Sequence, residues 1–246
     1  MPPAPPGRPA ADRSSRVMRA LNAFAFVSWP VFFVLLYIED THPFAFDLVV
    51  RERGPVELGT FACYFVACVL FARLAYAAAK HREPLLVPLW YAAFAVLCFL
   101  ASMEEISWGQ AWFHYATPFG LADVNEQGEL NFHNLPGMME LNSVFLPAFG
   151  LSGLAGVWLA RVPAFRAIAV PRALAPLMAW IAALGLLATA CDLWLLLPVF
   201  DYVVLSMSEL TELFVSLACV AYAVLAARAL RDAWRPGAAA REPART

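Results

Sequence analysis

Long apolar stretches, separated by shorter polar ones, make up most of the chain. A helix needs about 20 mostly apolar residues to cross the hydrocarbon core of a bilayer. Six stretches have about that length or more: Ala20–Ile38, Val56–Ala79, Leu85–Met103, Ser143–Ala160, Ala173–Phe200 and Val203–Ala227. The pattern predicts an all-α protein, a polytopic transmembrane bundle of six helices that occupies residues 20–230.

The composition supports a membrane protein and excludes two other classes. Of the 246 residues, 62% are hydrophobic and 15% are charged, whereas a soluble domain averages about 45–50% and about 25%. A water-soluble enzyme of this size could not bury so much apolar surface. The formal net charge of −2 gives no basic surface for nucleic acid. The five cysteines all lie in apolar runs, where they act as small apolar side chains and not as a disulfide framework.

The basic residues mark one side of the predicted bundle. Of the 17 Lys and Arg, all but Arg51 and Arg53 lie before the first run, after the last run, or around the links that follow the second and fourth runs. Cytoplasmic loops of membrane proteins are enriched in Lys and Arg. Both termini are therefore predicted to be cytoplasmic, as disordered tails at 1–19 and 231–246.

The link between the third and fourth runs, residues 104–142, differs from the other links because it contains no Lys or Arg. It combines acidic residues with aromatic ones: Glu104, Glu105, Asp123, Glu126, Glu129 and Glu140 with Trp108, Trp112, Phe113, Tyr115 and Phe119. This composition predicts a structured extracytoplasmic cap pressed into the headgroup region of the bilayer. The alternative is a solvated loop above an interfacial belt of aromatic residues.

Carboxylates inside the apolar runs are the first candidates for chemistry, because ionisable groups in a bilayer are costly and usually functional. Glu104 and Glu105 end the third run, and Glu209 and Glu212 share one face of the sixth run at i,i+3 spacing. These four are the predicted catalytic residues, and Asp192 is expected at a similar depth. Carboxylates gathered on the outer leaflet would either retain some protons or bind a cation.

A divalent metal ion is the predicted cofactor of this group. Glu129 and His133 are four residues apart, so on a helix they would share a face and could both ligate a metal. Asp192 is the third hypothetical ligand. The polar residues around them are the predicted substrate-binding set: Ser107, Trp108, Gln110, Asn131 and Asn134. Since no nucleophile motif surrounds Ser107, it is interpreted as a hydrogen-bonding residue at a helix end.

Two segments carry a resemblance to a known family. EEISWGQ at 104–110 and NEQGELNFHN at 125–134 resemble an uncharacterised family of bacterial polytopic membrane proteins, over residues 104–135 and extending to Ser208–Glu212. The resemblance implies a multi-pass protein of a bacterial inner membrane in which these segments belong together, and it implies no activity. The alkaline ceramidase-like hydrolases hold zinc with three histidines. This chain lacks their paired C-terminal histidines and has Glu209 and Glu212 instead, which counts against zinc amidase chemistry.

Three functions remain open from the sequence. The first is a metal-dependent membrane enzyme that acts on a lipid or lipid-linked substrate at the outer leaflet. The second is a proton- or cation-coupled transporter. The third is a non-catalytic partner that assembles with another membrane protein through the cap. A separate set of small residues, Ala148, Ser152 and Gly156 with Gly150 and Gly153 beside them, predicts close helix packing.

Overall fold

The computed structural model describes residues 19–20, 22–23, 26–27, 34, 54–125, 128–132, 135–192 and 199–235, with the backbone alone at 111, 139–143, 191–192 and 199–208. Within these residues every regular element is a helix. The all-α prediction is therefore confirmed for the described part of the chain. The few described residues of the first predicted run are helical, and the ring of Phe26 stacks on Trp180 with 5.6 Å between ring centroids.

The second and third predicted runs form an antiparallel pair of helices, α3 (Pro55–Lys80) and α4 (Leu86–Glu105). Pro55 stands in the first turn of α3, where its fixed φ suits a helix and its missing N–H costs nothing. The helices are joined by a short turn in which Arg82 adopts a φ of 56°. Both helices end within two residues of the predicted bounds.

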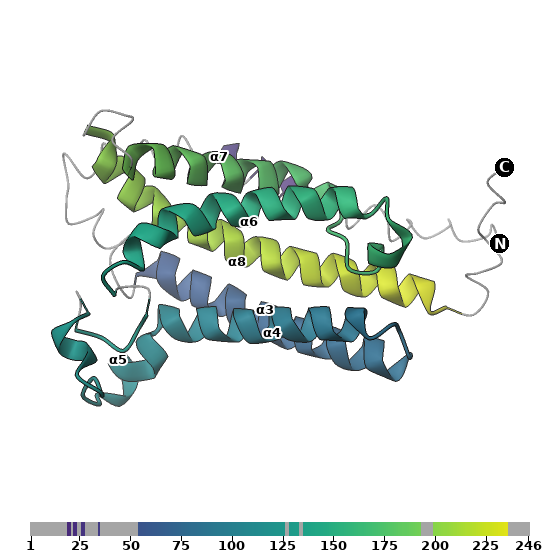
Figure 1. Cartoon of the computed structure of the whole chain (residues 1–246), viewed down its shortest axis with the longest axis horizontal. Helices are drawn as coiled ribbons and strands as arrows, with labels where there is room; N and C mark the ends of the chain where they lie inside the picture. Colours follow the sequence, from purple (N-terminus) through teal and green to yellow (C-terminus); the bar gives the residue numbers. More distant parts are fainter. Residues whose placement is uncertain are drawn as a thin grey trace, which may run out of the picture.

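The remaining helices are α6 (Met139–Leu159), α7 (Ala175–Asp192) and α8 (Val199–Ala233). Two 3-10 turns, η3 (Pro163–Phe165) and η4 (Arg172–Leu174), lie in the link between α6 and α7. Figure 1 shows α8 between the α3–α4 pair and the α6–α7 pair, and α8 packs against α3 and α7.

The bounds of α8 differ from those of the predicted run at both ends. The helix begins at Val199, before the predicted start at Val203, so Asp201 lies in its first turn. At the other end α8 continues to Ala233, past the predicted limit of the helical domain at residue 230. The indole N–H of Trp234 there donates a hydrogen bond of 2.7 Å to Glu83, which ties the end of α8 to the α3–α4 turn.

Four of the described helices are long and apolar enough to cross a membrane: Pro55–Lys80, Leu86–Glu105, Arg172–Ala190 and Glu209–Ala233, with mean hydropathies between 1.9 and 2.1. A shorter apolar helix, Val144–Leu159, packs against α7. The helix ends that carry Lys80, Arg172 and Arg231 lie at one end of the bundle, and the end of α4 and the short helix α5 lie at the other (Figure 1). The two ends of the described bundle therefore differ as the distribution of basic residues predicts: basic residues lie at one end and the acidic cap lies at the other. Six membrane spans and cytoplasmic termini stay predictions.

Glycines bring α6 and α7 into close contact. A Cβ atom on Gly150 would lie 2.7 Å from the Cα of Ala182, and one on Gly185 would lie 2.8 Å from the carbonyl carbon of Leu146. A Cβ atom on Gly153 would meet the side chain of Met178. The close packing predicted for the small residues of α6 is confirmed for Gly150 and Gly153, and for Gly156, which meets Val170 of the link to α7. It was wrong for Ala148 and Ser152, which are exposed.

The interior of the bundle half remote from the cap is aromatic. The rings of the aromatic cluster lie 5.2 to 6.2 Å apart between centroids: Phe71, Trp90, Tyr91, Phe94 and Tyr222. The hydroxyl of Tyr91 donates to the carbonyl of Ala167 at 2.6 Å, and that of Tyr222 donates to the carbonyl of Ile168 at 2.5 Å. These two bonds hold the α6–α7 link against α4 and α8.

Candidate functional site

A sharp reversal follows the last turn of α4 and starts the cap. Ser107, Trp108 and Gly109 have φ angles of 45°, 56° and 82°, so three consecutive residues adopt left-handed conformations. For Ser107 and Trp108 such angles are costly and persist only where other contacts hold them. The hydroxyl of Tyr115 donates to the carbonyl of Trp108 at 3.1 Å. The reversal leads into η1 (Ser107–Gly109) and α5 (Gln110–Phe113).

The side chain of Ser107 lies at the centre of a buried hydrogen-bond network. Its hydroxyl donates to the carboxylate of Glu129 and accepts a bond of 3.1 Å from the amide of Asn131. The amide of Asn125 in turn donates to the side-chain oxygen of Asn131 at 2.8 Å. Ser107, Asn125 and Asn131 are only 4%, 5% and 2% exposed. Their hydrogen bonds therefore hold the start of the cap, at Ser107, against its later part, at Asn125 and Asn131.

Glu104 and Gln110 extend this network to both sides. One carboxylate oxygen of Glu104 accepts from the indole of Trp108 at 2.8 Å, and the other accepts from the backbone N–H of Phe132 at 2.5 Å. The side-chain oxygen of Gln110 accepts from the N–H of Leu130 at 2.7 Å. The segments EEISWGQ and NEQGELN are thus hydrogen-bonded to each other.

Thr117 completes the cap and was not predicted from the sequence. Its hydroxyl accepts from the amide of Gln110 at 2.7 Å and donates to the carbonyl of Gly128 at 2.5 Å. A single threonine in a polar loop gives no sequence signal for such a role. η2 (Leu121–Asp123) lies between these partners and begins after Gly120, whose φ is 70°.

The predicted metal site lacks its helical framework. Residues 128–132 form bends and not a helix, because Gly128 has a φ of 67° and the N–H of Glu129 donates to the side chain of Asn125. Glu129 therefore does not present its carboxylate on a helix face, and it accepts from Ser107 instead. Among the described residues no three His, Cys, Asp or Glu side chains are placed to hold a metal ion. His133, Asn134 and the side chain of Asp192 lie outside the described residues.

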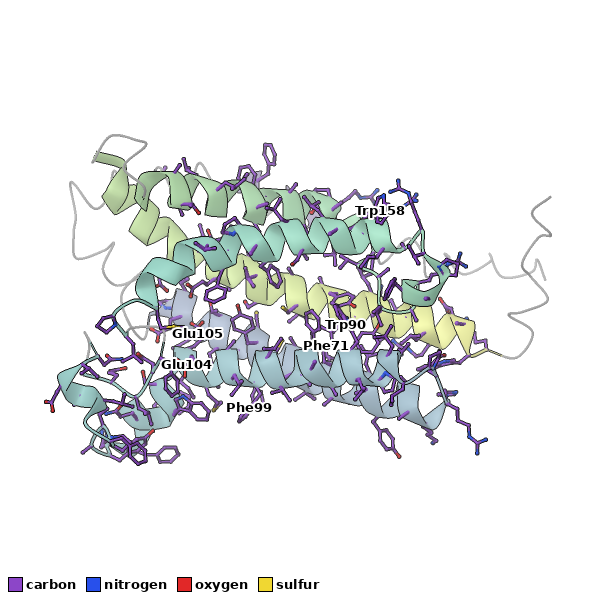
Figure 2. The ribbon with its side chains drawn as sticks, viewed as in Figure 1. Phe71, Trp90, Phe99, Glu104, Glu105 and Trp158 are labelled. Atoms are coloured by element: carbon purple, nitrogen blue, oxygen red, sulfur yellow. The ribbon has the colours of Figure 1, made fainter. Side chains whose placement is uncertain are left out.

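Glu105 faces away from the cap network. Its carboxylate interacts electrostatically with those of Glu212 and Glu209 of α8, Glu57 of α3, and Glu104. Figure 2 shows Glu104 and Glu105 together at the cap end of α4. The structure thus brings together the four carboxylates predicted as catalytic. Glu57 is a fifth member that was not predicted from the sequence, although its charge at the start of an apolar run was a signal for it.

The residues of this short segment differ in their partners. Ser107, Trp108 and Gln110 build the cap, and Glu105 belongs to the carboxylate cluster (Glu57, Glu104, Glu105, Glu209 and Glu212). Glu104 does both, because it accepts hydrogen bonds from the cap and interacts with Glu105. Interacting carboxylates can divide protons among themselves, so that one acts as an acid and its neighbour as a base. Comparison of the chain with protein-family models, with curated proteins and with solved structures finds no match.

Replacing either adjacent glutamate by glutamine is expected to have opposite effects on stability. Glu104→Gln replaces an accepting oxygen by a donor that faces Trp108 or Phe132, which costs about 1–3 kcal/mol. Glu105→Gln removes one charge from a group of like charges, so it leaves the melting temperature in detergent unchanged or raises it. An equal loss in both variants would contradict this division of roles.

Proposed function

We propose that the chain is a multi-pass protein of a bacterial inner membrane that binds a lipid or lipid-linked molecule at the outer leaflet. In this proposal Glu105, with Glu209 and Glu212, supplies acid and base groups for a reaction on the polar part of that molecule. Six membrane spans and cytoplasmic termini belong to the same proposal. The concentration of basic residues at the end of the bundle opposite the cap supports that orientation.

The observation that carries the proposal is the direction of Glu105. Its neighbours Glu104, Ser107 and Gln110 are used within the cap, while Glu105 meets carboxylates from two other helices. Ionisable groups that several apolar helices bring together are more often functional than structural.

The surface of the cap supports a position of this cluster beside the lipid. Phe119 and Phe113 are 95% and 76% exposed, and Trp112 packs its ring against Phe61 of α3 with 5.8 Å between centroids. Exposed aromatic side chains at the ends of membrane helices favour the interface between headgroups and acyl chains. The same end of α4 is apolar on its outer face, where Leu97 and Leu100 are exposed.

The charge of the site favours one class of headgroup. Residues 104–142 contain no Lys or Arg, and the cluster contributes carboxylates from α3, α4 and α8. Such a site repels an anionic phosphate and attracts an amine, and its oxygens accept hydrogen bonds from sugar hydroxyls. We therefore expect an amine-bearing or glycosylated lipid as the bound molecule.

The test uses the full chain in nanodiscs made with a total bacterial lipid extract. Lipid species are followed by mass spectrometry over time, and we expect one amine-bearing or glycosylated species to be bound and altered. Glu105→Gln and Glu212→Gln are expected to abolish that change. Asp232→Asn is the matched control, because Asp232 lies near the end of α8 remote from the cap and pairs at the surface with Arg235 at 3.4 Å.

Two results would overturn the proposal. The first is a lipid profile that the wild-type protein leaves unchanged, with no lipid species retained through purification. The second is equal binding and turnover by wild type and Glu105→Gln. Loss of activity in Asp232→Asn as well would show that the assay follows overall integrity and not the site.

A further inference from the structure

The α6–α7 link (residues 160–174) presents positive charge that its own helices do not balance. Arg161, Arg166 and Arg172 are exposed, and residues 141–191 contain these three arginines and no Asp, Glu or Lys. We propose that the link binds the headgroup of an anionic phospholipid in the leaflet at this end of the bundle. The inference does not depend on any reaction at the cap, which lies at the opposite end (Figure 1).

The backbone of the link is held in place by the bundle. The N–H of Val170 donates to the carbonyl of Gly156 at 3.2 Å, which closes the link at its base. Tyrosine hydroxyls from α4 and α8 donate to the carbonyls of Ala167 and Ile168. Ile168 is 4% exposed, whereas Arg166, two residues before it, is exposed. The link therefore has an inward side that packs on the bundle and an outward side that carries arginines, and a fixed backbone reduces the entropy lost on binding.

The two acidic residues described at this end of the bundle already have other partners. Glu83 accepts from the indole of Trp234 at 2.7 Å, and Asp232 pairs with Arg235 at 3.4 Å. Further basic residues lie at the same end: Lys80, Arg82, Arg228 and Arg231. The described residues of this end therefore carry a net positive charge, which attracts anionic lipid headgroups.

Apolar side chains beside the arginines favour a lipid over a free anion. Trp158 is 58% exposed, and its carbonyl accepts from the N–H of Arg161 at 3.0 Å, so the two residues share one turn. Figure 2 shows Trp158 near the end of α6 that is remote from the cap. Exposed apolar residues continue along that side of α6 in steps of three and four, at Ala148, Leu151 and Ala155. A tryptophan at the end of an apolar helix favours the boundary between acyl chains and headgroups, and an arginine one turn further reaches the phosphates.

The chemistry of arginine selects the class of headgroup. A guanidinium group presents its N–H donors in a planar fork that matches the oxygens of a phosphate, and the hydrogen bonds are charge-assisted. An anionic phospholipid offers this phosphate without a cation beside it. A zwitterionic lipid carries an ammonium group next to the phosphate, and the arginines repel that group. The basic end therefore prefers the headgroup charge that the acidic cap disfavours.

A general role of basic residues in topology makes a different prediction. Arginines at the ends of membrane helices commonly act as topological anchors, which requires positive charge and no particular site. In that case any three basic residues at this end contribute equally to the attraction of anionic lipid. A site on the link predicts instead that its three arginines matter far more than other basic residues nearby.

The test adds phosphatidylglycerol and phosphatidylethanolamine at equal concentrations to the full-length protein in a non-ionic detergent, and bound lipids are counted by native mass spectrometry. We expect wild-type protein to bind the anionic lipid about tenfold more than the zwitterionic one, because each basic residue near an anionic headgroup strengthens binding several-fold. Replacing Arg161, Arg166 and Arg172 together by glutamine is expected to bring this ratio to about one. Both lipids are counted in one sample, so a partial loss of folded protein does not change the ratio.

A matched control removes the same charge outside the link. Lys80→Gln, Arg82→Gln and Arg235→Gln, combined in one variant, change three exposed basic residues at the same end. That variant is expected to keep the ratio within about twofold of the wild-type value, because solvent and salt screen charges that do not touch the headgroup. A wild-type ratio near one would overturn the inference. So would an equal loss in both triple variants, or release of the bound phosphatidylglycerol by the same concentration of inorganic phosphate.

Discussion

Gly185→Ala is expected to destabilise the protein strongly, while the same replacement at Gly59 is expected to be harmless or stabilising. A Cβ atom on Gly185 would lie within 2.8 Å of the carbonyl carbon of Leu146 and would also meet Pro147, so the backbones of α6 and α7 would have to separate. Forcing extra volume into packed helices costs about 1–3 kcal/mol, and here the obstacle is backbone and not a flexible side chain. Because each helix moves as a unit, this separation is expected to weaken the neighbouring contacts between α6 and α7 as well.

Gly59 provides the matched control within α3. Its added Cβ would meet only the Cδ1 of Leu213 at 3.6 Å, an ordinary contact. Alanine in a helix interior is favoured over glycine by about 0.5–1 kcal/mol. The temperature at which half of each purified variant remains monodisperse in detergent should therefore fall for Gly185→Ala and stay level or rise for Gly59→Ala. Equal temperatures for both variants would show that α6 and α7 do not approach as closely as described.

The helices could be predicted from the sequence because the bilayer imposes a simple rule. The length of an apolar run predicted α3 and α4 to within two residues. The small residues of α6 were predicted to pack closely, but the sequence could not separate Gly150 and Gly153, which do so, from the exposed Ala148 and Ser152. Small residues occupy several faces of α6, and the face that packs depends on the position of Gly185 and Met178 in another helix.

The cap was predicted as a structured element, but its internal bonds were not. The residue types in EEISWGQ and NEQGELN indicated donors and acceptors, and the sequence cannot show that Ser107 and Glu129 are each other's partners. The helical spacing proposed for Glu129 failed because Gly128 and Asn125 favour a bend. Glu57 was missed because the first turn of a helix commonly carries an acid for its dipole, a local role that hid its position near Glu105.

The carboxylate cluster and the cap network have one physical relation. Glu104 accepts two hydrogen bonds from the cap, which fixes the end of α4 and with it the direction of Glu105. A rigid cap therefore orients the carboxylate that faces α3 and α8. This relation predicts that damage to the cap network alters the cluster even though no cluster residue is changed.

Asn131→Asp tests the cap network on which that relation depends, and it is expected to disrupt the cap. The replacement removes the amide that donates to Ser107 and places a second carboxylate beside that of Glu129 in a buried site, where Asn131 is 2% exposed. Leaving a buried group unsatisfied costs about 1–3 kcal/mol, and more where the group is charged. We expect limited proteolysis to cut the variant within residues 104–132 at protease concentrations that leave the wild-type protein intact, while the helices resist cleavage.

The pH dependence and a surface control make the result specific. Lowering the pH toward the usual aspartate range, about 3.9, should reduce the difference from wild type, because the introduced carboxyl group regains a donor for Ser107 once it is protonated. Asp123→Asn changes one charge at an exposed position of the same cap and should alter stability by no more than about 0.5 kcal/mol. If Asn131→Asp resisted protease as the wild type does at neutral pH, the buried network would not be what holds the cap, and the direction of Glu105 would need another cause.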